Sequence, residues 1–67
     1  MYFTVQIFNA YNVKVHNKDY YYNTKDKDFI ACNIKYLLEN DIDNIFIWKG
    51  DYIRVLFNDG DVIQVYC

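Results

Sequence analysis

The 67-residue sequence contains no proline, one histidine and only two glycines, Gly50 and Gly60. A glycine-rich loop that cradles phosphate groups cannot be built from two glycines ten residues apart. The neighbours of the single histidine, His16, are Val15 and Asn17, and neither can activate or orient it as a general base. We therefore predict that the protein is not an enzyme.

Metal and disulfide chemistry also have little basis in the sequence. The two cysteines, Cys32 and Cys67, lie far apart and form neither a CxxC motif nor a Cys/His ligand spacing. We therefore expect free thiols in a reducing cytoplasm, no metal site and no other cofactor. One catalytic alternative stays open, in which Cys32 pairs with His16 as nucleophile and base.

Positive charge is sparse and dispersed. The seven Lys and Arg residues are spread along a chain of formal net charge −2, without the basic stripe that binds phosphate backbones. Nucleic acid is therefore not expected as the main partner. It stays open as an alternative in which four lysines converge in three dimensions: Lys14, Lys18, Lys25 and Lys27.

Long apolar runs are also missing. No segment approaches the roughly 20 apolar residues of a membrane span. The first residues lack the basic region and the continuous apolar region of a secretory signal. We expect a soluble protein without a membrane partner, located in the cytoplasm, or in the host cytoplasm if the protein is viral.

Aromatic residues, by contrast, are abundant: the chain has eight Tyr, five Phe and one Trp. A domain of this size buries only about 60% of the surface that its unfolded chain exposes. Several of these rings must therefore lie partly in water or against a partner. The composition predicts a single domain, residues 1–67, that acts by binding.

The N-terminal region has the period-2 pattern of strands. Residues 1–8 alternate apolar and polar side chains, and only Phe8 interrupts the polar side. After residues 9–10 the alternation resumes over residues 11–16, in phase with the first run. Both one long bent strand and two strands are compatible with this pattern.

A turn is predicted next, at the polar residues 17–19. The three tyrosines at positions 20–22 favour a short strand that returns antiparallel to the first. These rings admit three interpretations: packing at a strand end, contacts with a partner protein, or a stacking platform for nucleic-acid bases.

One helix is predicted over residues 29–38. Asn23 and Thr24 are capping residue types, and Asp26 and Asp28 fall in the first turn, where carboxylates favour the helix dipole. Five apolar residues share one arc of about 100° and are expected to pack on a sheet: Ile30, Ala31, Ile34, Leu37 and Leu38.

The C-terminal hairpin has the clearest local signal, with strands over residues 52–57 and 62–66 joined by an Asp-Gly turn. A two-residue loop would bury Gln64. A three-residue loop with Gly60 in a left-handed conformation gives a consistent inner and outer face. We therefore predict three cross-strand pairs: Val55 with Ile63, Ile53 with Val65, and Arg54 with Gln64.

Residues 45–48 are apolar and form a further predicted strand. The expected fold is α+β with the order β-β-α-β-β-β. It has an antiparallel sheet of four to five strands with one helix packed on one face. The sequence leaves the strand order undetermined. Because one helix covers only one face, the outer face is left for water or a partner.

The candidate partner-binding residues come from that outer face and from the aromatic segment of the first hairpin. They are Tyr20, Tyr21, Tyr52, Arg54, Leu56 and Tyr66. Tyrosine and arginine are enriched at the centres of protein interfaces. An alternative uses the same face, or an edge strand, to close a homodimer with a structural role.

The chain also resembles a known group of proteins. Its residues are biased toward Asn, Asp, Ile, Lys and Tyr, as in AT-rich genomes, and the turn at residues 56–61 precedes a short strand that ends at Cys67. This compact layout is similar to that of some of the smallest anti-CRISPR proteins of phages and mobile elements. The resemblance implies an inhibitor that blocks a host defence protein by steric occlusion.

Overall fold

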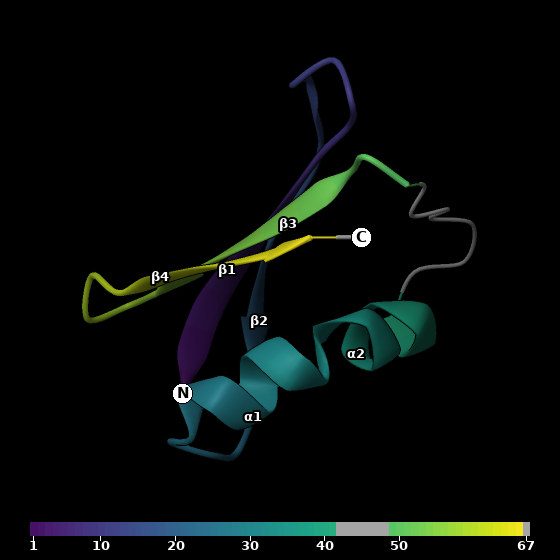
Figure 1. Cartoon of the computed structure of the whole chain (residues 1–67). Helices are drawn as coiled ribbons and strands as arrows, with labels where there is room; N and C mark the ends of the chain where they lie inside the picture. The colour runs from purple at the N-terminus through teal and green to yellow at the C-terminus, as the bar shows by residue number, and fades with distance from the viewer. Residues whose placement is uncertain (42–48, 67) are drawn as a thin grey trace.

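The fold combines a four-stranded sheet with two short helices (Figure 1). The structure is a computed structural model that describes residues 1–41 and 49–66. The sheet has the order β2-β1-β3-β4, and all neighbouring strands are antiparallel. In chain order the elements are β1 (Tyr2–Phe8), β2 (Lys14–Tyr21), α1 (Lys27–Cys32), α2 (Ile34–Asp41), β3 (Tyr52–Phe57) and β4 (Val62–Tyr66).

This arrangement confirms an α+β protein with an antiparallel sheet. The strand expected at residues 45–48 lies outside the described residues. Neither of the described helices has the length and apolar character needed to cross a membrane.

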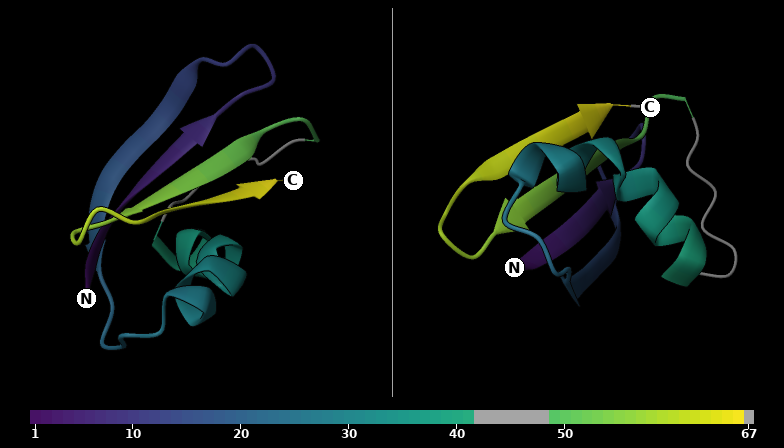
Figure 2. Two further views of the ribbon diagram at one scale, coloured as in Figure 1. Left: turned by 60° about the vertical axis from the view of Figure 1, so that its left-hand side comes forward. Right: turned by 90° about the horizontal axis from the view of Figure 1, so that it is seen from below.

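The core lies between the two helices and one face of the sheet, which we call the inner face. Figure 2 shows α1 and α2 lying across this face in the view from below. Each buried Val, Ile, Leu or Phe stabilises the fold by roughly 1.5–3 kcal/mol. Three residues each from β1, β3 and the helices form the buried cluster: Phe3, Val5, Ile7, Ile53, Val55, Phe57, Ile30, Ile34 and Leu38.

The helical segment differs from the prediction because it is divided at Asn33. The Asn33 side chain donates a hydrogen bond to the carbonyl of Phe29 at 2.8 Å, and its own N–H donates to the same carbonyl. Asparagine competes in this way with regular helix geometry. The cap is also different: Asp26, rather than Asn23 or Thr24, accepts the Phe29 N–H. Four of the five residues of the predicted apolar arc nevertheless face the core across both helices, Ile30, Ile34, Leu37 and Leu38.

The first hairpin turns earlier than predicted. Its loop lies between β1 and β2, where the Asn9 side-chain oxygen accepts the N–H groups of Tyr11 and Val13 at 2.9 and 3.0 Å. Asn12 completes this loop in the left-handed region, at φ 63°. The predicted turn at residues 17–19 is wrong, since these residues pair with β1 in the middle of β2.

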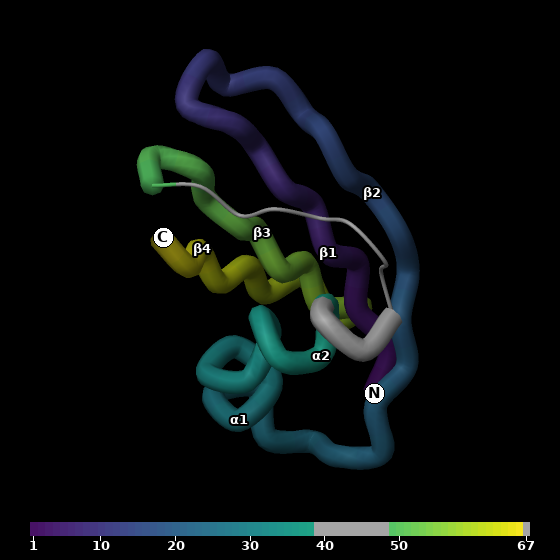
Figure 3. Tube along the Cα trace, turned by 90° about the vertical axis from the view of Figure 1, so that its right-hand side faces the viewer, coloured from purple at the N-terminus to yellow at the C-terminus, as the bar shows by residue number. Residues whose placement is uncertain are grey.

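The polar residues in β2 have a physical explanation. Among the described strands, β2 lies at the margin of the sheet and pairs on one side only, with β1 (Figure 3). Most of its side chains are exposed, so charged residues are tolerated there and help to block unwanted strand pairing. A polar run therefore lies within a strand instead of marking a turn.

The predicted register of the last hairpin is confirmed. Gly60 has φ 98°, and its N–H donates to the Phe57 carbonyl at 3.0 Å. The Phe57 N–H donates to the Asp61 carbonyl at 2.8 Å and closes the three-residue loop. The pairs Val55 with Ile63, Ile53 with Val65, and Arg54 with Gln64 follow from this geometry.

Candidate functional site: the outer face of the sheet

The outer face is the side of the sheet opposite the helices. Both described helices lie on the inner side in each view, so neither covers it (Figures 1 and 2). Strand alternation brings a mixed polar and aromatic set of side chains to this face. They are Tyr2, Thr4, Gln6 and Phe8 from β1, Lys14, Asn17, Asp19 and Tyr21 from β2, Tyr52, Arg54 and Leu56 from β3, and Val62, Gln64 and Tyr66 from β4.

Three rings from three adjacent strands form a row at one end of this face. We call Phe8, Tyr52 and Tyr66 the aromatic row. The Phe8 and Tyr52 rings stack with their centroids 4.9 Å apart and their planes 11° apart, and the centroids of Tyr52 and Tyr66 are 6.2 Å apart. The Tyr52 hydroxyl donates to the side-chain oxygen of Asn12 at 2.5 Å. The middle ring is therefore held from its face and from its hydroxyl.

Two cations lie against the aromatic row. The Arg54 guanidinium carbon is 5.2 Å from the centre of the Phe8 ring, and the Lys14 ammonium is 5.9 Å from it. Both distances are typical of cation–π contacts. The cations come from strands on the two sides of β1, so strand pairing rather than proximity in sequence brings them together.

The other end of the outer face is hollowed. Tyr2 and Tyr21 pack against each other there, with ring centroids 4.8 Å apart. The Thr4 hydroxyl donates to an Asp19 carboxylate oxygen at 2.6 Å. An open hollow of about 260 Å³ is lined by Tyr2, Phe3, Thr4, Asp19, Leu56, Phe57 and Asn58. This end can accept a small apolar group between tyrosine and leucine side chains.

Five of the six predicted contact residues share the outer face: Tyr21, Tyr52, Arg54, Leu56 and Tyr66. Tyr20 does not, because it is half-buried on the inner side and stacks on Phe3 with centroids 6.0 Å apart. Its hydroxyl also lies 3.0 Å from Nε2 of His16. Its neighbours identify Tyr20 as a residue at the edge of the core.

Phe8 and Tyr2 lie on the outer face but are not among the contact residues predicted from the sequence. Each belongs to the side of β1 that the alternation assigns to solvent, and Phe8 interrupts an otherwise polar pattern. That interruption was the available signal, because a large apolar residue on the solvent side of a strand needs a neighbour or a partner. The neighbour, Tyr52, lies far away in the sequence and is brought close by β1–β3 pairing.

The four lysines of the nucleic-acid alternative do not form one surface. Lys14 lies on the outer face, whereas Lys18 pairs opposite Val5 on the inner side, with its ammonium 5.4 Å from the Tyr20 ring. Lys25 and Lys27 line a separate hollow of about 580 Å³ together with three carboxylates, Asp26, Asp28 and Asp61. Acidic residues outnumber lysines there, and their negative charge disfavours binding of a phosphate backbone.

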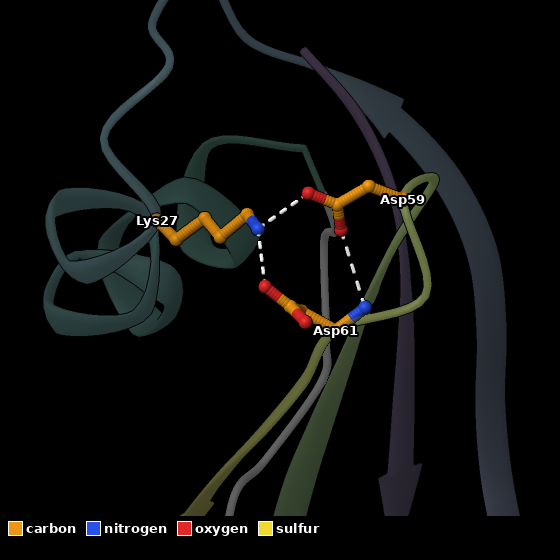
Figure 4. Close-up of polar contacts among 3 residues, drawn as sticks. All are labelled: Lys27, Asp59 and Asp61. Carbon is orange, nitrogen blue, oxygen red and sulfur yellow. Dashed lines mark hydrogen bonds and ion pairs between the residues drawn. The ribbon is translucent and has the colours of Figure 1, made fainter.

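A lysine bridge joins the first helix to the last hairpin (Figure 4). Lys27, at the start of α1, donates hydrogen bonds to the carboxylates of both Asp59 and Asp61. The hydrogen bonds to Asp59 and Asp61 raise the pKa of Lys27, and the bond to Asp59 has the larger effect. The same Lys27 hydrogen bond lowers the pKa of Asp59. The bridge therefore ties the loop that precedes β4 to the helical layer.

These pKa directions predict how the contribution of the bridge depends on pH. A lowered aspartate pKa stabilises the fold above the ordinary value of 3.8, and this contribution is lost as the pH falls below it. A raised lysine pKa stabilises the fold below the ordinary value of 10.5, and this contribution is lost as the pH rises above it. Lys27→Met is therefore expected to lower the urea midpoint at neutral pH, and to lower it less well below pH 3.8.

Lys35→Met supplies the control, because Lys35 is an exposed helix lysine outside the bridge. Its urea midpoint should differ little from that of the parent protein at either pH. If the difference between Lys27→Met and the parent protein were the same at both pH values, the ionic bridge would not be its cause.

Groups for metal or thiol chemistry are sparse in the described part of the chain. The described side chains, those of residues 1–38 and 49–66, contain no cluster of three or more His, Cys, Asp or Glu residues that could hold a metal ion. Cys32 is an exposed free thiol. Cys67 lies outside the described residues.

Comparisons with known proteins do not assign this arrangement to a family. No protein-family model matches the chain, and neither a curated protein nor a solved structure matches it.

Proposed function

We propose that this chain is a non-enzymatic protein-binding module whose contact surface is the outer face, centred on the aromatic row. The observation that carries the proposal is the stacked set of Phe8, Tyr52 and Tyr66 on a sheet face that the described helices leave open. Tyr66 is 72% exposed at the end of this row. Aromatic rings and arginine are the side chains that most often supply binding energy at protein interfaces.

The geometry of the row also favours binding on energetic grounds. Ordering a mobile side chain at an interface costs about 0.5–1.5 kcal/mol. Tyr52 is already held by its stacking on Phe8 and by its hydrogen bond to Asn12, so little of that cost remains at this position. A partner that covers Tyr66 and the neighbouring rings gains apolar burial without reordering the sheet.

We further propose that the partner is a host protein and that the chain inhibits it by occupying its surface. The support is the resemblance in layout and composition to small anti-CRISPR proteins. Such inhibition needs only that the outer face covers a surface of the host protein, without any chemistry of its own.

Tyr66→Ala tests the proposal. Removing an exposed interface tyrosine is expected to weaken binding to a captured partner by about fivefold or more, equivalent to about 1 kcal/mol. Tyr36→Ala is the matched control, because Tyr36 is a tyrosine of similar exposure, 64% against 72%, on the helical side of the molecule. The measurement is affinity capture from bacterial lysate with nuclease treatment, followed by titration of the identified partner.

Both variants should keep the melting temperature of the parent protein within a few degrees, since neither side chain is buried. Equal capture by the parent protein and Tyr66→Ala would remove the outer face as the contact surface. If Tyr36→Ala alone weakened capture, the contact surface would lie on the helical side instead.

A second candidate function is self-association through β4. Among the described strands, β4 pairs only with β3 and lies at the margin of the sheet. Val62 and Tyr66 are 52% and 72% exposed on it, and exposed edge strands with such side chains favour pairing with another strand. Light scattering over a range of concentrations tests it, because a dimer predicts a mass that rises with concentration and a monomer predicts a constant mass.

A further inference from the structure

The outer face carries two cations that have no acidic partner within the described part of the chain. Lys14 and Arg54 both lie over Phe8, and neither has a carboxylate at ion-pair distance among the side chains of residues 1–38 and 49–66. Lys27 differs from them, because Asp59 and Asp61 already satisfy it. Among these described side chains, no carboxylate neutralises the positive charge of Lys14 and Arg54.

From this arrangement we infer that the outer face binds an acidic, extended segment of the partner protein, an inference that rests on the proposed function. A carboxylate of this segment lies between Lys14 and Arg54 above the aromatic row. An apolar side chain of the same segment fills the hollow beside Tyr2 and Leu56.

The pair of cations, Lys14 and Arg54, suits a carboxylate for geometric reasons. The guanidinium of Arg54 is planar and presents paired N–H donors that match the two oxygens of a carboxylate. The Phe8 ring lies against the guanidinium and against the Lys14 ammonium, so a single ring positions both cations. Because Phe8 is stacked on Tyr52, the ring that both cations contact is held in place before the partner arrives.

Strand geometry sets the distance between the aromatic row and the hollow. Tyr52, in the aromatic row, and Leu56, at the hollow, are separated by four positions along β3. At about 3.4 Å per residue this separation is about 14 Å. An extended peptide covers the same distance in about four residues. The partner segment is therefore expected to carry an Asp or Glu about four residues from its apolar anchor.

The charge distribution favours a protein segment over nucleic acid. Two cations can satisfy one or two carboxylates, whereas a phosphate backbone needs a continuous basic track. The same face carries Asp19 beside the hollow, and the whole chain has a net charge of −2. A repeating anion would meet repulsion there that a single acidic segment avoids.

The test is a selection from a displayed library of random peptides, with the purified full chain as the target. Peptides recovered on the parent protein are expected to be enriched in Asp or Glu about four residues from an apolar or aromatic residue. Selection on Lys14→Gln/Arg54→Gln should lose the acidic enrichment. A recovered acidic peptide should bind this double variant about tenfold more weakly in fluorescence anisotropy.

Lys35→Gln serves as the matched control, since it removes an exposed lysine from α2 and leaves the outer face intact. It should keep both the acidic enrichment and the peptide affinity. Melting temperatures of all variants are compared with the parent protein, and the double variant is expected to stay folded because Lys14 and Arg54 lie outside the buried core.

Several outcomes would overturn the inference. Recovered peptides without acidic enrichment, or enrichment that survives in the double variant, would place the recognition elsewhere. A single-stranded DNA probe that binds more tightly than the peptides, and is lost in the double variant, would assign the face to nucleic acid. A concentration-dependent mass that disappears in the double variant would assign it to a second copy of this chain.

The same experiments separate this inference from the proposed function. If Tyr66→Ala weakens partner capture while the selected peptides show no acidic preference, the outer face is a protein-binding surface and only the acidic segment is wrong. If neither Tyr66→Ala nor the double variant changes capture or peptide selection, the proposed function fails as well.

Discussion

Replacing Ile30 with alanine is expected to lower the free energy of unfolding by about 2–5 kcal/mol. Ile30 has no exposed surface and lies in the cluster that joins the helices to the inner face of the sheet. The alanine leaves a cavity that this close-packed cluster can fill only in part. A domain of this size has a total stability of only about 3–10 kcal/mol, so the expected loss is a large fraction of it.

Urea denaturation followed by circular dichroism measures this effect. Tyr36→Ala is the control in the same helical region, where a side chain that is 64% exposed should change the stability by no more than about 0.5 kcal/mol. If the two variants had the same midpoint, the helices would not pack on the sheet as described. Loss of the helical layer would also remove the support beneath β1 and β3, which carry most of the aromatic row.

Replacing Gly60 with valine is the second large prediction, with an expected loss of about 1–3 kcal/mol. Gly60 has φ 98°, a conformation that a β-branched residue adopts only under strain. A Cβ atom at this position would meet no other atom within 4 Å, so the loss comes from the backbone and not from a steric clash. The three-residue loop sets the β3–β4 register and therefore the position of Tyr66 beside Tyr52.

Gly60→Asn gives a graded comparison, because asparagine tolerates the left-handed region better than valine. Its urea midpoint is expected to lie between those of the parent protein and Gly60→Val. Equal midpoints for all three proteins would show that the hairpin does not depend on the backbone conformation at this position. If Gly60→Val is stable enough to assay, it should also bind a captured partner more weakly, since Tyr66 follows the register.

The two hairpins show why one part of the fold could be predicted and another could not. In the second hairpin, the turn residues and the alternation of the flanking strands agree, so the register follows from local sequence. In the first hairpin the turn is made by the side chain of Asn9, whereas residues 17–19 have turn composition but lie within a strand. An edge strand tolerates polar residues, so its composition does not identify it.

The helix shows a similar division. The apolar arc that includes Ile30, Ile34 and Leu38 was predicted correctly, because helical spacing alone decides which side chains share a face. The break at Asn33 was not predicted. It depends on a single asparagine that bonds to the Phe29 carbonyl, and asparagines also occur within uninterrupted helices.

The sequence by itself determined the α+β class, the helical face that packs in the core, the register of the second hairpin and, through that register, the placing of Tyr52, Arg54, Leu56 and Tyr66 on the outer face. These features follow from periodicities of 2 and 3.6 residues and from the backbone freedom of glycine, all of which act over a few neighbouring positions. Only the tertiary structure decided that Phe8, Tyr52 and Tyr66 form one row, and that Lys14 and Arg54 share a ring. These contacts depend on the strand order β2-β1-β3-β4, in which β1 lies between strands that come before and after the helices in the chain. Local patterns do not specify strand order, because it is set by the way the whole chain buries its apolar surface.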